Sequence, residues 1–227
     1  YANYAKRVRE TIDSVVPGLP VFHNGGHIRH GRRDLVFANT HLEIESLPTG
    51  GWGYDHFPVS AAYTRTLGVE YLGMTGKFHT QWGEFGGFKH PNALWYETSL
   101  SIANGAGCSI GDQLHPSGKI DMATYKMIGK AYGEVEAKEE YIKGSIHLAD
   151  IGVLSTEAID NYNRSKNFSV GVSTKIGKSN AGCARILLEG NYLFNYIDLE
   201  EDFGKYQLAI FLELLQELCG LYKQMFL

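Results

Sequence analysis

"VEYLGMTGKFHTQWGEFGGFKHPNALWYETSLSIANGAGCSIGDQL", residues 69–114, is the stretch that decides the fold class. Apolar runs over 69–76 and 108–114 predict two short strands. Between them, "PNALWYETSLSIANGAG" predicts a helix with Pro91 in its first turn and glycines after its last turn. A strand, a helix and a second strand in this order predict a parallel pair of strands with a helical crossover.

The same alternation continues on both sides of this unit. It predicts strands over 19–26 and within 35–48, and helices over 1–16, 59–68 and 119–137. A parallel sheet of this kind belongs either to a (β/α)8 barrel or to an open doubly wound sheet, and the pattern alone does not separate the two. Because a full barrel takes about 250 residues, a barrel that ends near residue 142 would be represented by its second half.

A new pattern of strands and helices begins after residue 142. "HLADIGVLS" (147–155) predicts a strand, and 180–210 predict a helix, a strand, an acidic turn and a further strand. The last run, 211–227, predicts an amphipathic helix. We therefore expect a first α/β domain over 1–142 and a second, smaller α/β domain over 145–227.

Composition and charge exclude several classes of protein. The net charge of −4 and the absence of a basic run argue against nucleic acid or an anionic membrane as partners. Three widely spaced cysteines without a C-x-x-C pair argue against a zinc module or a disulfide framework and indicate a reducing, cytoplasmic location. No apolar run approaches the roughly 20 residues that span a bilayer. The chain starts without Met inside a helical pattern, so we expect a fragment whose N-terminal part is missing.

Polar side chains gather after the predicted strands, where both candidate architectures place their active sites. The most unusual are Glu43 and Glu45, which lie two positions apart on an apolar strand and therefore point to the same side. An unpaired charge in a packed layer is costly. These carboxyl groups are therefore either the acid of a glycosidase site or partners in a structural ion pair with Arg or Lys of a neighbouring strand.

The glycine-rich turn "GGWGYDHFP" follows this strand. Trp52 and Tyr54 offer flat faces for the apolar side of a sugar ring, while Asp55 and His56 offer hydrogen bonds to hydroxyl groups. The alternative is a turn with core aromatics, in which Asp55 or Ser60 caps the next helix.

A second candidate loop, "TGKFHTQWGEFGG", follows the next strand. Lys77, His79, Trp82 and Glu84 lie in it, and charged and aromatic loop residues on a rigid scaffold often bind or react. Further pocket-lining candidates are His23, Asn24 and Asp112. The histidines of "HNGGHIRHGRR" lack an acidic partner, so we expect no metal site. "GVSTKIGKS" has the wrong glycine spacing for a phosphate loop, and we expect no cofactor.

Four blocks together resemble a known family: "EIESLPTGGWGYDHFP", "YLGMTGKFHTQWGEFGGFKHP", "IANGAGCSIGDQLHPSGKID" and "GCARILLEG…YIDLEEDFGKYQLAI". They are similar to bacterial glycoside hydrolases of the family 151 α-L-fucosidase type, a group related to the family 42 β-galactosidases. The resemblance implies the C-terminal half of a (β/α)8 barrel followed by the start of a flavodoxin-like domain similar to the β-galactosidase trimerisation domain.

The resemblance also implies retaining hydrolysis of an α-L-fucoside. The arrangement of a glutamate upstream of "GGWGY" is similar to that of family 29 fucosidases, which makes Glu43 the first choice for the acid/base and Glu45 the next. The nucleophile would lie in the missing N-terminal part, with Glu84 as a fallback and Asp112 as a weaker candidate. We expect a small carbohydrate or glycoside substrate and a homo-oligomeric parent protein. The alternatives are a β-galactosidase-like enzyme and a non-catalytic carbohydrate-binding or inactive fragment.

Overall fold

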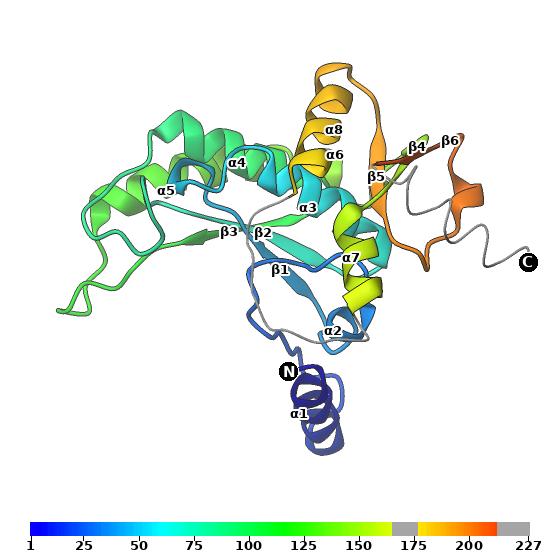
Figure 1. The fold of residues 1–227 in the computed structure, drawn as a ribbon. Helices are drawn as coiled ribbons and strands as arrows, with labels where there is room; N and C mark the ends of the chain where they lie inside the picture. Colours follow the sequence, from blue (N-terminus) through cyan, green and yellow to red (C-terminus); the bar gives the residue numbers. More distant parts are fainter. Residues whose placement is uncertain (165–176, 213–227) are drawn as a thin grey trace, which may run out of the picture. The chain divides into compact units, whose positions relative to one another are not determined.

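The computed structural model describes residues 1–164 and 177–212 of the 227-residue chain (Figure 1). The chain divides into two compact units: residues 1–28 with 33–147, and residues 29–32 with 148–227. The rejected phosphate loop over 171–179 and the predicted helix over 211–227 fall largely outside the described residues. Each unit is described by itself below.

The first unit is built on a parallel sheet, as the sequence predicts. Its strands are β1 (Leu42–Glu45), β2 (Tyr71–Gly76) and β3 (Gly107–Gly111), in the order β1-β2-β3. Glu43 lies opposite Leu72, which in turn lies opposite Gly107. The predicted strand–helix–strand unit over 69–114 is therefore confirmed as a parallel pair with a helical crossover.

The four predicted helices of the first unit are found, as α1 (Ala2–Val15), α3 (His56–Thr64) with η2 (Arg65–Leu67), α4 (Pro91–Ala103) and α5 (Met122–Glu136). The short helices α2 (Arg33–Val36), η1 (Pro48–Gly50) and α6 (Glu139–Ile142) occur in addition. Helix α5 begins at Asp121, whose side chain accepts a hydrogen bond from the backbone N–H of Ala123 at 2.9 Å. Helix α4 begins with Pro91, and Gly68 in the left-handed region (φ +67°) ends the α3–η2 segment. Figure 1 shows α4 and α5 along one side of the sheet.

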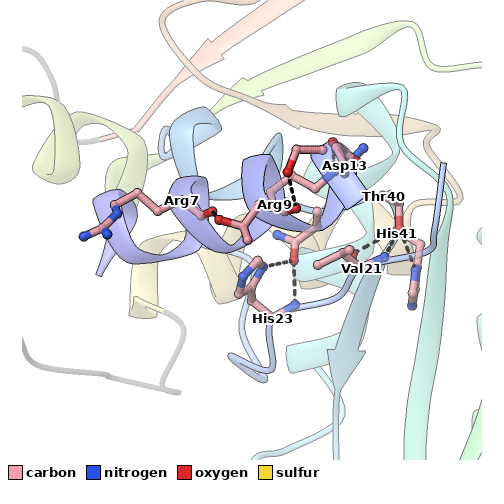
Figure 2. A network of polar contacts seen from close by, with 10 residues as sticks. Arg7, Arg9, Asp13, Val21, His23, Thr40 and His41 are labelled. Atoms are coloured by element: carbon pink, nitrogen blue, oxygen red, sulfur yellow. Dashed lines mark hydrogen bonds and ion pairs between the residues drawn. The ribbon is translucent and has the colours of Figure 1, made fainter. Parts of the chain in front are cut away.

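The strand predicted over 19–26 is wrong. No strand forms here: several of its backbone hydrogen bonds go to residues 39 and 40 of a neighbouring loop, and only the Gly26 carbonyl bonds to β1, accepting from the Glu45 N–H (3.0 Å). The Val21 N–H donates to Thr40 Oγ1 (2.8 Å), and the Val21 carbonyl accepts from the Thr40 N–H (2.8 Å). The His23 N–H donates to Asn39 Oδ1 (2.7 Å), as Figure 2 shows. Because the Val21 and His23 N–H groups donate to side chains, they are not available for a strand ladder.

The two faces of β1 differ sharply in burial. Leu42 and Ile44 are 2% and 0% exposed, and Glu43 and Glu45 alternate with them in partly exposed positions. On β2, a Cβ added to Gly73 would lie 2.4 Å from Ser101 Oγ of α4, so α4 packs closely on the face that holds Ile44. The glutamates therefore lie on the face that these helices do not cover.

The second unit also contains a parallel sheet. Its strands are β4 (Ile151–Leu154), β5 (Phe194–Ile197) and β6 (Leu208–Phe211), in the order β5-β4-β6, with α7 (Thr156–Arg164), α8 (Lys178–Glu189) and η3 (Phe203–Lys205) between them. The helix, strand, turn and strand predicted over 180–210 are confirmed. Of the helices in residues 1–164 and 177–212, none has the length and apolar character required to cross a membrane.

Residues 29–32 complete the second unit although they lie far from it in sequence. His30 is fully buried, and its Nδ1 lies 2.7 Å from Ser155 Oγ at the end of β4. The Asn161 amide donates to the His30 carbonyl oxygen (2.9 Å). Gly31 adopts φ +76°, and a Cβ there would lie 3.1 Å from Ala158 Cα of α7. The short segment is thus packed as tightly as a core element.

We expect Gly31→Ala to destabilise the second unit by up to about 3 kcal/mol. The left-handed backbone alone costs roughly 1–2 kcal/mol for a residue with a Cβ, and the close approach to Ala158 adds to it. Hydrogen exchange of the β4 and β5 amides measures the change. Gly18→Ala is the matched control, because Gly18 has φ +79° and nothing within 4 Å of an added Cβ. Equal effects of the two substitutions on β4 would contradict the packing argument.

Candidate active site

In the part of the chain that the structure describes, the two glutamates of β1 form no ion pair with the neighbouring strand β2. Their partners across the sheet are Leu72 and Met74 of β2. The ionisable partner of Glu43 is His41 of the same segment, whose Nε2 lies 3.6 Å from Glu43 Oε1. Among the described residues, no Lys or Arg forms an ion pair with either glutamate. Within the described sheet, the structural ion pair considered from the sequence is therefore not seen at these carboxyl groups.

Glu45 is partly enclosed by the loop before β1. Its backbone N–H donates to the Gly26 carbonyl (3.0 Å), and a Cβ added to Gly26 would lie 3.3 Å from Glu45 Oε2. The loop before β1 thus covers this carboxyl group, and the Asn24 side chain hydrogen-bonds to it. Burial raises the pKa of Glu45, the neighbouring charge of Glu43 raises it further, and the Asn24 bond lowers it in part. The result is a strand-end carboxyl group with an increased tendency to hold a proton.

We expect Glu43→Gln to lower the pKa of Glu45, because the substitution removes the neighbouring negative charge. Asn24→Ala should raise the same pKa, because the carboxylate loses a hydrogen bond. Carbon-13 NMR titration of the Glu45 side-chain carboxyl group measures both changes on the chain itself. A Glu45 pKa that is unmoved by either substitution would mean that the three side chains are not in contact.

The turn after β1 places its predicted binding residues at different depths. Tyr54 is 43% exposed and Trp52 is partly exposed, so both ring faces are accessible. His56 is 1% exposed; its ring lies against Trp52 (centroids 5.0 Å apart), and its Nδ1 lies 3.2 Å from Ser46 Oγ. Asp55 is partly exposed at the first position of α3 and makes no side-chain cap bond. His56 thus packs against Trp52 as a buried ring, while Trp52 and Asp55 are partly exposed and Tyr54 is exposed.

The loop over 77–89 places further predicted residues at the end of β2. Lys77 is buried, with its Nζ lying 5.1 Å from the centroid of the Phe88 ring. Trp82 is 38% exposed and packs against Phe78 with ring centroids 5.5 Å apart. His79 is exposed. Trp82 and His79 are therefore accessible, whereas Lys77 is enclosed between aromatic rings.

Of three other predicted residues, Glu84 and His23 have local partners, and Asp112 follows β3. Glu84 accepts hydrogen bonds from the Thr80 N–H (2.7 Å) and hydroxyl (2.9 Å), which lower its pKa and stabilise its own loop. His23 Nδ1 lies 3.0 Å from Asn39 Oδ1 (Figure 2). Asp112 is partly exposed directly after β3. Within residues 1–164 and 177–212, no group of three or more His, Cys, Asp or Glu side chains is arranged to hold a metal ion.

Sequence reasoning missed a buried charge pair behind these loops. Lys89 and Glu97 are 1% and 5% exposed and form an ion pair, with Thr75 bonded to both. Burial raises the pKa of Glu97 and lowers that of Lys89, and each charge partly offsets the shift of the other. One signal was present: Glu97 is a lone charge in the otherwise apolar stretch 91–103. The adjoining hollow has room for about one water molecule and is too small for a sugar ring.

Comparison with known proteins relates the chain to glycosidases. It is similar to alpha-L-fucosidase isoenzyme 2 from Paenibacillus thiaminolyticus, with 58% identity and a TM-score of 0.82 over 92% of this chain and 31% of that chain. The fold is also similar to the cold-adapted beta-galactosidase from Rahnella sp. R3 (15% identity, TM-score 0.69, 92% and 35% covered). It is further similar to the GH42 beta-galactosidase Gan42B (14% identity, TM-score 0.63, 92% and 37% covered).

These comparisons bear on the family and on the fold. No protein-family model matches the chain, and the comparison with curated proteins gave no match. The chain spans about a third of the length of the solved structures that it matches. Its mixed α/β fold matches parts of glycosidase barrel proteins. The resemblance of the motif blocks is confirmed: the chain is a relative of the α-L-fucosidases of the family 151 type, a group related to the family 42 β-galactosidases.

Proposed function

We propose that this chain supplies part of the active site of a retaining, exo-acting glycoside hydrolase that cleaves α-L-fucosides. The observation that carries the proposal is the environment of Glu45. Its carboxyl group lies at the end of a parallel strand, on the face not covered by helices, with burial and the charge of Glu43 favouring its protonated form. A glycosidase needs such a protonated carboxyl group to donate to the leaving oxygen. The 58% identity to an α-L-fucosidase supports the substrate class.

Glu45 is our choice for the general acid/base, ahead of Glu43. In the first step Glu45 would give its proton to the leaving oxygen, and in the second its carboxylate would take a proton from the attacking water. The charge of Glu43 helps to keep the Glu45 pKa raised. We place the nucleophile in a strand of the whole protein outside this chain. Glu84, already bonded to Thr80, serves better as an organiser of its loop.

The accessible aromatic residues define the substrate-binding part of the proposal. Tyr54 and Trp82 are exposed and Trp52 is partly exposed, on loops that follow β1 and β2. Aromatic faces bind the apolar side of a sugar ring, and Asp55 and His79 can hydrogen-bond to its hydroxyl groups. A small carbohydrate is therefore the substrate class that this set of residues fits best.

For the domain organisation, we propose that residues 1–142 form the second half of a (β/α)8 catalytic barrel. Residues 145–227 would then begin a flavodoxin-like domain that resembles the β-galactosidase trimerisation domain. The division of the chain into units near residue 147 supports this organisation, as does the parallel order β5-β4-β6 of the second sheet. A homo-oligomeric whole protein follows from the same proposal.

The test uses a chimera in which this chain replaces the matching segment of the Paenibacillus thiaminolyticus fucosidase. Its activity is measured on a panel of aryl glycosides. Hydrolysis of an aryl α-L-fucoside supports the proposal. Hydrolysis of aryl β-D-galactosides alone would assign the site to the β-galactosidase-like alternative. Binding of L-fucose by a correctly folded chimera without turnover of any glycoside would leave a carbohydrate-binding role.

A further inference from the structure

The buried ion pair behind the candidate binding loops joins three separate elements. Thr75 lies near the end of β2, Lys89 ends the loop 77–89, and Glu97 lies on α4. Lys89 Nζ contacts Glu97 Oε2 and donates to Thr75 Oγ1 at 2.9 Å, while the Thr75 hydroxyl donates to Glu97 Oε2 at 2.5 Å. Glu97 Oε2 thus binds both Lys89 and Thr75 away from water, while the second carboxylate oxygen, Oε1, is buried without a hydrogen-bond partner.

Lys89 ties down the base of the loop that carries His79 and Trp82. Its backbone N–H donates to the Lys77 carbonyl (2.8 Å), which brings the two ends of the loop together. The Lys77 N–H in turn donates to the Gly111 carbonyl at the end of β3 (3.0 Å). The Lys89 side chain then connects this closed base to α4 through Glu97. The ion pair therefore links the base of the loop to α4.

The other candidate binding loop reaches the same carboxylate. The hydroxyl of Tyr54 faces Glu97, and the pKa of Tyr54 is raised by burial and then by the Glu97 charge. The Tyr54 ring also packs edge-on against Tyr96 of α4, with centroids 5.7 Å apart. A small hollow lined by Tyr54, Thr75 and Glu97 lies at this junction. One carboxylate on α4 thus contacts both loops whose aromatic residues are exposed.

A buried ion pair is weak evidence for a role in stability. The cost of removing two charges from water can exceed their attraction, and apolar residues of similar volume are often as stable. Hydrogen bonds within an ion pair are directional, so each donor must lie at a defined distance and angle from the acceptor. Such a pair therefore constrains the relative positions of the elements that carry its members. The geometry here fixes Thr75, Lys89 and Tyr54 relative to one carboxylate.

We propose that Glu97 is a positioning residue that holds the loops 50–56 and 77–89 in a fixed arrangement at the ends of β1 and β2. The significance of this arrangement for catalysis rests on the proposed function. The residue need not touch substrate itself. It acts through Tyr54 on one loop and through Lys89 on the other.

Glu97→Gln tests the proposal because it keeps the shape of the side chain and removes its charge. Hydrogen exchange on this chain should show amides of both loops exchanging about tenfold faster or more, while α5 amides change by less than about twofold. Thr98→Val is the control, because Thr98 is equally buried on α4 and its hydroxyl bonds only to the carbonyls of its own helix. This control should leave exchange in both loops unchanged.

A second variant separates positioning from charge balance. Glu97→Leu with Lys89→Met removes both charges, so a role in charge balance alone predicts normal protection of the loops, whereas a positioning role predicts that they still exchange faster. Loop exchange unchanged in Glu97→Gln, or accelerated equally in α5, would overturn the proposal. In the chimera, Glu97→Gln should raise KM for an aryl α-L-fucoside more than it lowers kcat. A chimera without any turnover would contradict the proposed function but would leave the exchange result to decide this one.

Discussion

Glu45→Gln is expected to lower kcat/KM of the chimera for phenyl α-L-fucoside by about 10²- to 10⁴-fold, the usual contribution of a general acid. Phenolate is a poor leaving group and requires a proton from the enzyme as the glycosidic bond breaks. Dinitrophenolate leaves without protonation, so the same substitution should affect the first step for a dinitrophenyl α-L-fucoside much less. Steady-state kinetics on both substrates measure the difference. An equal loss on both would contradict the assignment of Glu45 as the acid.

Glu43→Gln is the matched control on the same strand. It should retain more activity than Glu45→Gln. Because loss of the Glu43 charge lowers the Glu45 pKa, Glu45 would lose its proton at a lower pH. The alkaline limb of the pH–rate profile should therefore move to lower pH in this variant. A complete loss of activity in Glu43→Gln with retention in Glu45→Gln would reverse the roles of the two residues.

Lys89→Met is expected to lower the free energy of unfolding of the chain by about 3–5 kcal/mol, because it leaves the Glu97 carboxylate buried without its cation. Urea denaturation measured by tryptophan fluorescence reports this, since all three tryptophans lie in the first unit. The loss should diminish as the pH falls. Burial raises the Glu97 pKa, and removal of Lys89 raises it further, so the folded variant gains a proton and stability at lower pH.

The double variant Lys89→Met with Glu97→Leu should recover most of the lost stability. It replaces both charges by apolar side chains of similar volume, a change that is often neutral or stabilising. A double variant as unstable as Lys89→Met alone would contradict the view that an unpaired buried carboxylate causes the loss.

Hydrophobic periodicity together with the positions of Pro and Gly was sufficient to predict the parallel sheet of the first unit. The alternation of Leu42 and Ile44 with two glutamates marks one buried face of β1, and the burial in the structure follows it. Pro91 and the glycines after residue 103 bound α4 correctly. The segment 19–26 could not be predicted correctly, because its backbone is satisfied by Asn39 and Thr40. Hydrogen bonds from side chains to the backbone produce no hydrophobic periodicity that the sequence would show.

The sequence predicted which residues of the candidate site lie at strand ends, but it did not predict how deeply each side chain is buried. The sequence places Glu45 at the end of a strand, yet the loop that covers it comes from Gly26. His56 and Trp52 belong to one turn, but only the structure separates the buried ring from the accessible one. The burial of Lys89 and Glu97 could not be predicted, because their contact joins a loop to a helix and no local sequence pattern marks it.

The most direct test of the account is turnover of an aryl α-L-fucoside by the chimera with both Glu43 and Glu45 changed to Gln. The account predicts that the unmodified chimera hydrolyses phenyl α-L-fucoside and that the double variant loses this activity by at least about 10²-fold. Circular dichroism would confirm that the two proteins are equally folded. Normal turnover in the double variant would contradict the assignment of the β1 carboxyl groups as the acid of the active site.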